Sequence, residues 1–423
     1  MILDRSKSPD FQIPQDINLP SPIKRTLANG VHLYFIPTPE IDACRLEICT
    51  DAQLAHSSSD KKLTSFFTLH MIMEGTRGMT ASEIDDFFDF FASEVDVSSG
   101  FEHNSISLLT TKKHFSKVLP IFSSLLTDAI FPEKELAKRK SQKALNISIQ
   151  KEKTSVSASQ QFRQQLFGAD HPYGQIADES DVADVQRQDL IQYYKESLLV
   201  NPEIFLTGNL GAFELELITE TLGKLNVTFT EKEILNFENK PQERQYELRE
   251  EAVQSSLRIG FHLLAKTHPD YFPITIFNTI LGGYFGSRLI KNIREDKGHT
   301  YGIYSTIGSL KQADYWVIMA DVQKAYIHEV IEEIYKEIDL LKTNLVPEEE
   351  IELVRNYMIG NFLSTFSSPF ELINKFKTVH HAGLDMDFYA KKLAYIREFT
   401  AEDVQRVAQK YFDTQDLIEV IVG

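Results

Sequence analysis

The sequence predicts an α+β protein of two tandem homologous domains, each a mostly antiparallel sheet with helices on one face. Strand-like and helix-like segments do not follow the strict strand–helix–strand order of a parallel sheet. The order of segments in the first half also recurs in the second. Asp189 and Asp403 lie 214 positions apart, and so do His114 and His328. This constant spacing indicates that one domain has been duplicated.

The first half opens with a turn signal, Ala28-Asn29-Gly30, before a β-rich run. Thr80 precedes Glu83 by three positions, which predicts a capping box at the start of a helix. In order, we expect strands at 31–37 and 45–48, an apolar helix at 63–75 ended by a glycine, a helix at 81–91, a hairpin at 95–110, and helices at 114–128 and 133–167.

The second half repeats this order. Residues 401–423 match residues 187–209 as a helix, a turn and a strand, so both halves end alike. The other predicted elements are a strand at 256–261, an apolar helix at 271–283, a helix near 287–293, strands between 300 and 322, and a helix at 328–341.

These patterns place an N-terminal domain at residues 1–227, a linker at 228–249 and a C-terminal domain at 250–423. The linker is charged and has little apolar periodicity, as linkers do. A tandem pair of such domains predicts a site between them.

Composition excludes several classes of protein. The net charge is −17 and no basic patch stands out, so we expect no nucleic-acid binding. No apolar run approaches a membrane span, and residues 1–16 lack the features of a secretory signal. We therefore expect a protein that is cytoplasmic or otherwise soluble. Cys44 and Cys49 have an odd spacing in a predicted strand, which places them on opposite faces as buried apolar residues.

The segment FFTLHMIMEGT, from Phe66 to Thr76, resembles the zinc helix of the pitrilysin-like, or insulinase-like, metallopeptidases. In that family, an H-x-x-E-H motif supplies two histidines on one helix face and a glutamate that activates the bound water. Here Phe66 replaces the first histidine and Leu69 replaces the glutamate, so only His70 remains. We expect His70 to pack within its helix with one hydrogen bond.

The family's third ligand is a glutamate on a later helix. The corresponding position here is Asn146 or Ile147, and neither is a carboxylate; Glu152 lies about a turn further on. A catalytic zinc usually needs about three protein ligands. The resemblance thus implies a chain that binds no metal and has no catalytic residue of its own.

Other parts of the resemblance are intact. Residues 170–174, DHPYG, match a turn that follows the long helix in the family. Residues 286–301 match a stretch whose Arg and Tyr contact substrate in active members, and these residues are Arg294 and Tyr301 here. The alternative for Arg294 is a surface ion pair with Glu295 or Asp296, and for Tyr301 a half-buried strand position.

The remaining histidines are interpreted as residues without a functional role. His380 and His381 are adjacent on a predicted helix, where neighbours point apart, so surface histidines are favoured over a metal pair. Glu102 and His103 lie near the predicted hairpin turn, where a solvated loop is favoured.

Three functions remain open. Because family members often work in pairs, the resemblance implies the non-catalytic, substrate-binding subunit of a heterodimeric zinc peptidase, with zinc on a homologous partner and Arg294 and Tyr301 contacting the peptide. The second is a peptidase-fold scaffold or peptide-binding protein without a catalytic partner. The third is an autonomous peptidase, for which the sequence offers no nucleophile motif.

Overall fold

The computed structural model describes residues 17–52, 61–231 and 244–423. The N-terminal segment considered as a signal, residues 1–16, lies outside the described residues, as does most of the expected linker, residues 232–243. Within the described part of the chain, no helix combines the length and apolar character that crossing a membrane requires.

The first half is built on a six-stranded sheet with the order β1-β2-β6-β3-β5-β4, in which only β2 and β6 pair in parallel. Its strands are β1 (Ile23–Thr26), β2 (His32–Pro37), β3 (Ala43–Asp51), β4 (Glu94–Ser99), β5 (His103–Thr111) and β6 (Glu203–Gly208). Its helices are α1 (Thr64–Met71), α2 (Ala81–Phe90), α3 (Lys112–Thr127), α4 (Glu133–Glu152), α5 (Thr154–Phe167), α6 (Glu179–Asp184), α7 (Arg187–Glu196) and α8 (Ala212–Leu222).

The second half is built on a five-stranded sheet with the order β7-β11-β8-β10-β9, in which only β7 and β11 pair in parallel. Its strands are β7 (Gln245–Glu247), β8 (Gln254–Leu263), β9 (Thr300–Ser309), β10 (Asp314–Gln323) and β11 (Ile418–Val422). Its helical segments are α9 (Tyr271–Asn278), η1 (Thr279–Gly283), η2 (Ile290–Asp296), η3 (Lys324–Tyr326), α10 (Ile327–Thr343), α11 (Glu348–Ser364), α12 (Pro369–His381), α13 (Asp387–Glu398) and α14 (Ala401–Tyr411).

The two sheets have the same plan, which confirms the predicted fold class. Strands β6, β3, β5 and β4 follow one another as β11, β8, β10 and β9 do. Helices α7 and α14 begin with capping boxes whose third residues are Asp189 and Asp403. The capping box of Thr80 and Glu83 is present as well. The repeat found in the sequence therefore corresponds to two halves with the same strand order.

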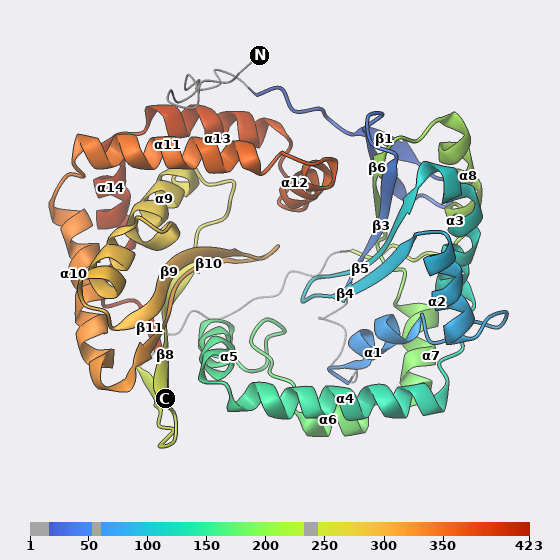
Figure 1. Ribbon diagram of the computed structural model, residues 1–423, viewed down its shortest axis with the longest axis horizontal. Coiled ribbons are helices and arrows are strands. Elements are labelled where there is room, and N and C mark those ends of the chain that lie inside the picture. The colour runs from blue at the N-terminus through green and yellow to red at the C-terminus, as the bar shows by residue number, and fades with distance from the viewer. Residues whose placement is uncertain (1–16, 53–60, 232–243) are drawn as a thin grey trace, which may run out of the picture.

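Each half covers the inner face of the other half's sheet with one helix (Figure 1). Helix α5 packs on β8 and β11, where Phe162 and Leu166 join Val420 in one apolar cluster. Helix α12 packs on β6, and its Phe376 ring lies 5.2 Å from the ring of Tyr34 on the neighbouring strand β2, tilted by 50°. The other face of the first sheet packs on helices α1, α3, α7 and α8 of its own half. The exchange of α5 and α12 joins the halves through buried apolar surface.

One predicted helix is wrong in its extent. Residues 133–167 form two helices instead of one, because Lys153 adopts an extended conformation with ψ 118° between α4 and α5. The break turns α5 away from α4 and onto the second sheet. The apolar helix at 63–75 is also shorter than predicted, since α1 ends at Met71.

The two cysteines lie as predicted. Cys44 is buried among the outer helices of the first half, whereas Cys49 lies in the apolar cluster that includes α12. Both are free thiols on opposite faces of β3.

Candidate functional site

Helix α1 presents Phe66 and His70 on one face, one turn apart, as the two metal positions of the family motif require. Their rings stack with centroids 4.1 Å apart. The Nδ1 of His70 donates to the Phe66 carbonyl oxygen at 2.9 Å, so Nε2 carries the free lone pair. Leu69 is fully buried in the apolar core of the first half. His70 thus packs within its own helix.

Helix α4 contacts this face of α1 through the side chain of Lys143. The Nζ atom of Lys143 lies 3.8 Å from the centre of the Phe66 ring, a cation–π contact. Ile147, one turn further, is buried in the core of the first half, whereas Asn146 is exposed to solvent. Glu152 is exposed at the C-terminal end of α4. The α4 side chain that faces the degenerate zinc position is therefore Lys143.

The electrostatics of this face disfavour a metal ion. Burial lowers the pKa of His70, and the positive charges of Arg139 and Lys143 lower it further, so the ring is neutral. The same two positive charges repel a cation bound beside His70. Burial also lowers the pKa of Lys143. Glu74, the nearby carboxylate, accepts from Arg139 Nε at 2.8 Å. One histidine beside an ammonium group does not fit zinc, and no cluster of three or more His, Cys, Asp or Glu side chains suited to a metal occurs among the described residues.

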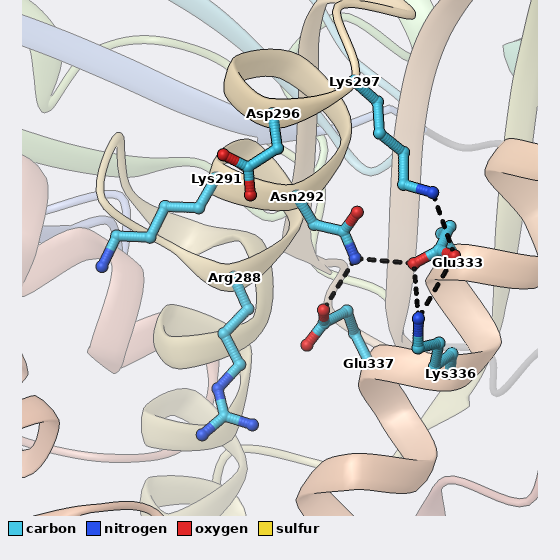
Figure 2. A pocket seen from close by; sticks show the side chains of 8 residues that line it. All are labelled: Arg288, Lys291, Asn292, Asp296, Lys297, Glu333, Lys336 and Glu337. Carbon is cyan, nitrogen blue, oxygen red and sulfur yellow. Dashed lines mark hydrogen bonds and ion pairs between the residues drawn. The ribbon is translucent and has the colours of Figure 1, made fainter.

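Arg294 lies on η2, a π-helical segment, and such segments are rare and frequent at functional sites. Asn292 anchors η2 to α10, because its Nδ2 donates to both Glu333 and Glu337 at 2.8 Å (Figure 2). These groups line a polar hollow of about 410 Å³ together with Arg288, Lys291, Asp296, Lys297 and Lys336. These hydrogen bonds hold η2, which carries Arg294, against α10.

Arg294 makes no ion pair with Glu295 or Asp296, or with any other acid in the described ranges. Its guanidinium group instead lies 5.0 Å from the centre of the Phe285 ring, which is 64% exposed. The guanidinium thus keeps its hydrogen-bonding capacity for other partners.

Tyr301 lies on β9, directly after η2, and is 89% exposed. Tyr304, three positions further along β9 and therefore on its other face, is 51% exposed. The backbone keeps η2 and β9 together, since His299 N donates to Ile293 O at 3.1 Å. The structure therefore presents Arg294 and Tyr301 from adjoining segments as solvent-accessible donors.

Strands β9 and β4 form free edges of the two described sheets, because each pairs with only one neighbour. The β9–β10 and β4–β5 hairpins both point toward the middle of the ring of elements in Figure 1. A free edge offers backbone N–H and C=O groups that an extended peptide can pair with.

The expectation of two surface histidines on α12 is wrong. Both reach Glu203 on β6, with Nε2 of His380 at 2.7 Å and Nε2 of His381 at 3.1 Å from its carboxylate oxygens. Burial alone would raise the pKa of Glu203, but these hydrogen bonds outweigh it and hold the pKa well below its usual range. His103 is half-buried, stacks on His381 at 4.2 Å, and has its pKa lowered by burial to about 3.

Glu102 is likewise not in a solvated loop. Its carboxylate accepts from the backbone N–H of Lys311 at 2.6 and 2.7 Å and from the Tyr173 hydroxyl. Tyr173 belongs to the DHPYG turn and is buried. A Cβ at Gly174 would lie 2.0 Å from the Gly168 carbonyl oxygen, so the turn requires glycine there. The turn thus connects the first half to the β9–β10 loop.

The comparisons with known proteins agree with this geometry. Residues 184–358 match the family described as "Peptidase M16 inactive domain". "Uncharacterized zinc protease YmxG" of Bacillus subtilis is 24% identical over 357 residues, which cover 82% of this chain and 85% of that protein. "Non-peptidase homolog YmxG" of Helicobacter pylori is 22% identical over 386 residues, which cover 87% and 86%. The crystal structure of a "peptidase M16 inactive domain" from Pseudomonas fluorescens matches with a TM-score of 0.82 at 19% identity, covering 95% of this chain and 98% of that one.

The class is therefore a peptidase-like α+β fold of two repeated halves. The resemblance inferred from the zinc helix and the Arg/Tyr stretch is confirmed: residues 184–358, which include Arg294 and Tyr301, match the inactive domain of the M16 peptidases, and the chain shares the fold of a solved domain of that kind.

Sequence reasoning missed Lys143 and the Glu203 cluster. Lys143 lies within one turn of both Asn146 and Ile147 on α4, so helical periodicity alone does not show which of these side chains faces α1. The Glu203 cluster has no local signal, because its members come from β6 and α12, which are far apart in the chain.

Proposed function

We propose that the chain is the non-catalytic, substrate-binding subunit of a heterodimeric zinc metallopeptidase that acts on peptides. The zinc lies on a homologous partner chain with an intact H-x-x-E-H motif. The observation that carries the proposal is the presentation of Arg294 on η2 and Tyr301 on the strand that follows it. The Arg294 guanidinium has no ion pair within the described residues, and the Tyr301 side chain is 89% exposed.

Both groups suit an extended peptide. A guanidinium and a phenol donate hydrogen bonds to peptide carbonyl groups, or to the oxyanion that forms on the scissile carbonyl at the partner's zinc. The free edge of β9 pairs with the peptide backbone beside them. In this proposal the degenerate zinc positions take no part in the chemistry; they are Phe66, Leu69, His70 and Asn146. Phe66, Leu69 and Asn146 supply no side chain suited to zinc. His70 is left alone, with the Lys143 ammonium against Phe66 on the same helix.

The test begins with capture of this chain from its native cells and identification of the bound proteins by mass spectrometry. A chain of similar size with the intact zinc motif is expected, and the reconstituted pair should cleave peptides. Arg294→Ala and Tyr301→Phe should each lower kcat/KM of the pair about tenfold or more, because each removes a donor to the substrate.

Arg25→Ala on the exposed strand β1 and Tyr326→Phe, whose ring stacks on His299, serve as matched controls and should leave kcat/KM unchanged. Peptide binding without turnover, and no zinc-bearing partner, would replace the proposal with a scaffold or peptide-binding protein. Turnover by the pure chain that a single substitution abolishes would replace it with an autonomous peptidase.

A further inference from the structure

A cavity of about 300 Å³ lies in the second half between α9, η1, β9, α11, α12 and α13. Two lysines from different helices enter it, Lys375 from α12 and Lys392 from α13. Apolar side chains, among them Ile307 and Phe362, form other parts of the wall. The cavity is separate from the α1 face and from the hollow beside η2.

Neither lysine has an anionic partner among the residues that the structure describes. Within the described parts of the chain, Lys375 and Lys392 have no ion pair and no side-chain hydrogen bond. Lys377, two positions after Lys375 on the same helix, contrasts with them, since its Nζ contacts the Glu47 carboxylate at 2.6 Å. Lys377, which faces the first sheet, therefore has a carboxylate partner, whereas Lys375, which faces the cavity, has none among the described residues.

The surroundings of Lys392 are positive. Burial lowers the pKa of Lys392 to about 8, and the charges of Lys375 and Lys266 lower it too, with no carboxylate acting in the opposite direction. The buried acid Asp314 accepts from Ser309 Oγ at 2.7 Å and is offset by Lys266 instead. Two ammonium groups that face one cavity without a counter-charge cost stability.

We propose that this cavity binds a carboxylate carried on a short hydrocarbon chain. The carboxylate oxygens accept hydrogen bonds from Lys375 and Lys392, and the hydrocarbon chain contacts the apolar wall at Ile307 and Phe362. The volume suits a group the size of one acidic side chain, at the small end of ligand sites.

Two sources carry this chemistry: a free small dicarboxylic acid, and an acidic residue of a peptide. The second source is within reach because Thr306 and Ile307 of the edge strand β9 line the cavity. A peptide paired with β9 then places one side chain in the cavity. Binding of either kind does not depend on a zinc-bearing partner, so it is measured on this chain alone.

The experiment follows thermal unfolding of the full chain with glutarate, at an ionic strength held constant with chloride. Saturating glutarate should raise the Tm of the natural chain by a few degrees. Lys392→Met should raise the Tm without ligand, since it removes a half-buried charge that has no anionic partner among the described residues, and should reduce the glutarate response. By calorimetry its affinity for glutarate should fall about tenfold or more.

Lys391→Met is the matched control, because Lys391 is the exposed neighbour of Lys392 on α13, and it should keep the full response. Two peptides that differ only in Glu or Gln distinguish the sources: preference for the Glu peptide, lost in Lys392→Met, assigns a peptide ligand, and a response to glutarate alone assigns a free acid. An equal response of the natural chain and Lys392→Met, or stabilisation by inorganic phosphate without any by glutarate, would overturn the proposal.

Discussion

Lys143 changes the chemistry of the α1 face more than the loss of any single ligand. Its ammonium contacts the ring of Phe66, the residue at the first metal position. A zinc ion bound beside His70 would meet this positive charge in a partly buried place, where Coulomb repulsion is screened less than at the surface. On this face, the positive charge of the Lys143 side chain lies against the residue at the first metal position, where the family motif holds a zinc ion.

This reading predicts how the face could regain a metal. Phe66→His with Lys143→Glu supplies, with His70, three ligands from α1 and α4, and the pair should bind one zinc per chain. Phe66→His alone should bind zinc at least about a hundredfold more weakly, because Lys143 remains. Zinc content after dialysis and chelator competition measure both.

The control for this prediction is Phe66→His with Asn146→Glu. Asn146 is exposed, so a glutamate there should not complete the site. Zinc binding by this control as tight as that of the Lys143→Glu pair would contradict the geometry described for α4.

At the scale of residues, side-chain chemistry indicated which ligands are missing, but the sequence could not show that Lys143 contacts Phe66. The sequence narrows the third-ligand position to Asn146 or Ile147, in a register that no landmark on α4 anchors. Which α4 side chain faces α1 depends on how the two helices cross, and that is a tertiary property.

Helix α12 makes polar as well as apolar contacts with the first half. Lys377 contacts Glu47, Asn374 accepts from Arg45 at 3.0 Å, and His380 reaches Glu203. These contacts surround the apolar contact of Phe376 with Tyr34. The helix is therefore attached to the first sheet by both burial and charge.

The attachment of α12 should weaken in acid. Burial alone would raise the pKa of Glu47, but Lys377, Ser105 and Arg45 outweigh it and lower the pKa to about 2. Because the folded pKa lies below the unfolded value, the pair contributes stability above about pH 4.5 and loses it as the pH falls toward 2. The contribution at neutral pH is about 3 kcal/mol.

Urea unfolding at several pH values measures this. Glu47→Gln should lower the free energy of unfolding at pH 7 and flatten its decline below pH 4.5. Glu40→Gln, at an exposed position between β2 and β3, should behave like the natural chain. An unchanged pH dependence in Glu47→Gln would show that the pair adds nothing to stability.

Elements were predictable where local signals are strong. The capping box at Thr80, the hairpin of β4 and β5, and the helix–turn–strand endings all stand as predicted. The break at Lys153 was not, because α5 turns away to pack on a sheet that follows some hundred residues later. The short edge strands β1 and β7 and the π-helical segments also lack a distinctive sequence pattern.

The exchange of α5 and α12 sets the behaviour of the whole molecule. A protease site introduced between residues 231 and 244 should, when cut, leave two fragments that stay together in gel filtration. Each fragment supplies a helix to the other's sheet, so the apolar contact survives without a covalent link.

Phe376→Ala in the cut protein tests the cause. Phe376 is buried and contacts Tyr34 and Phe205 of the first half, and its truncation costs about 3–5 kcal/mol of packing, so the fragments should separate at micromolar concentration. Separation of the unmodified fragments would instead mean that the chain connection holds the halves together.

The exchanged helices also describe a symmetry. A single copy of the repeated unit would leave the inner face of its sheet uncovered, and its helix equivalent to α5 or α12 would have no sheet to pack on. In two copies, the helix of each half packs on the sheet of the other, so the same contact occurs twice. An isologous two-fold dimer is built in this way. This polypeptide therefore carries the geometry of a dimer inside one chain, and its two unequal copies were free to diverge: one keeps the outline of a metal helix, the other bears Arg294 and Tyr301.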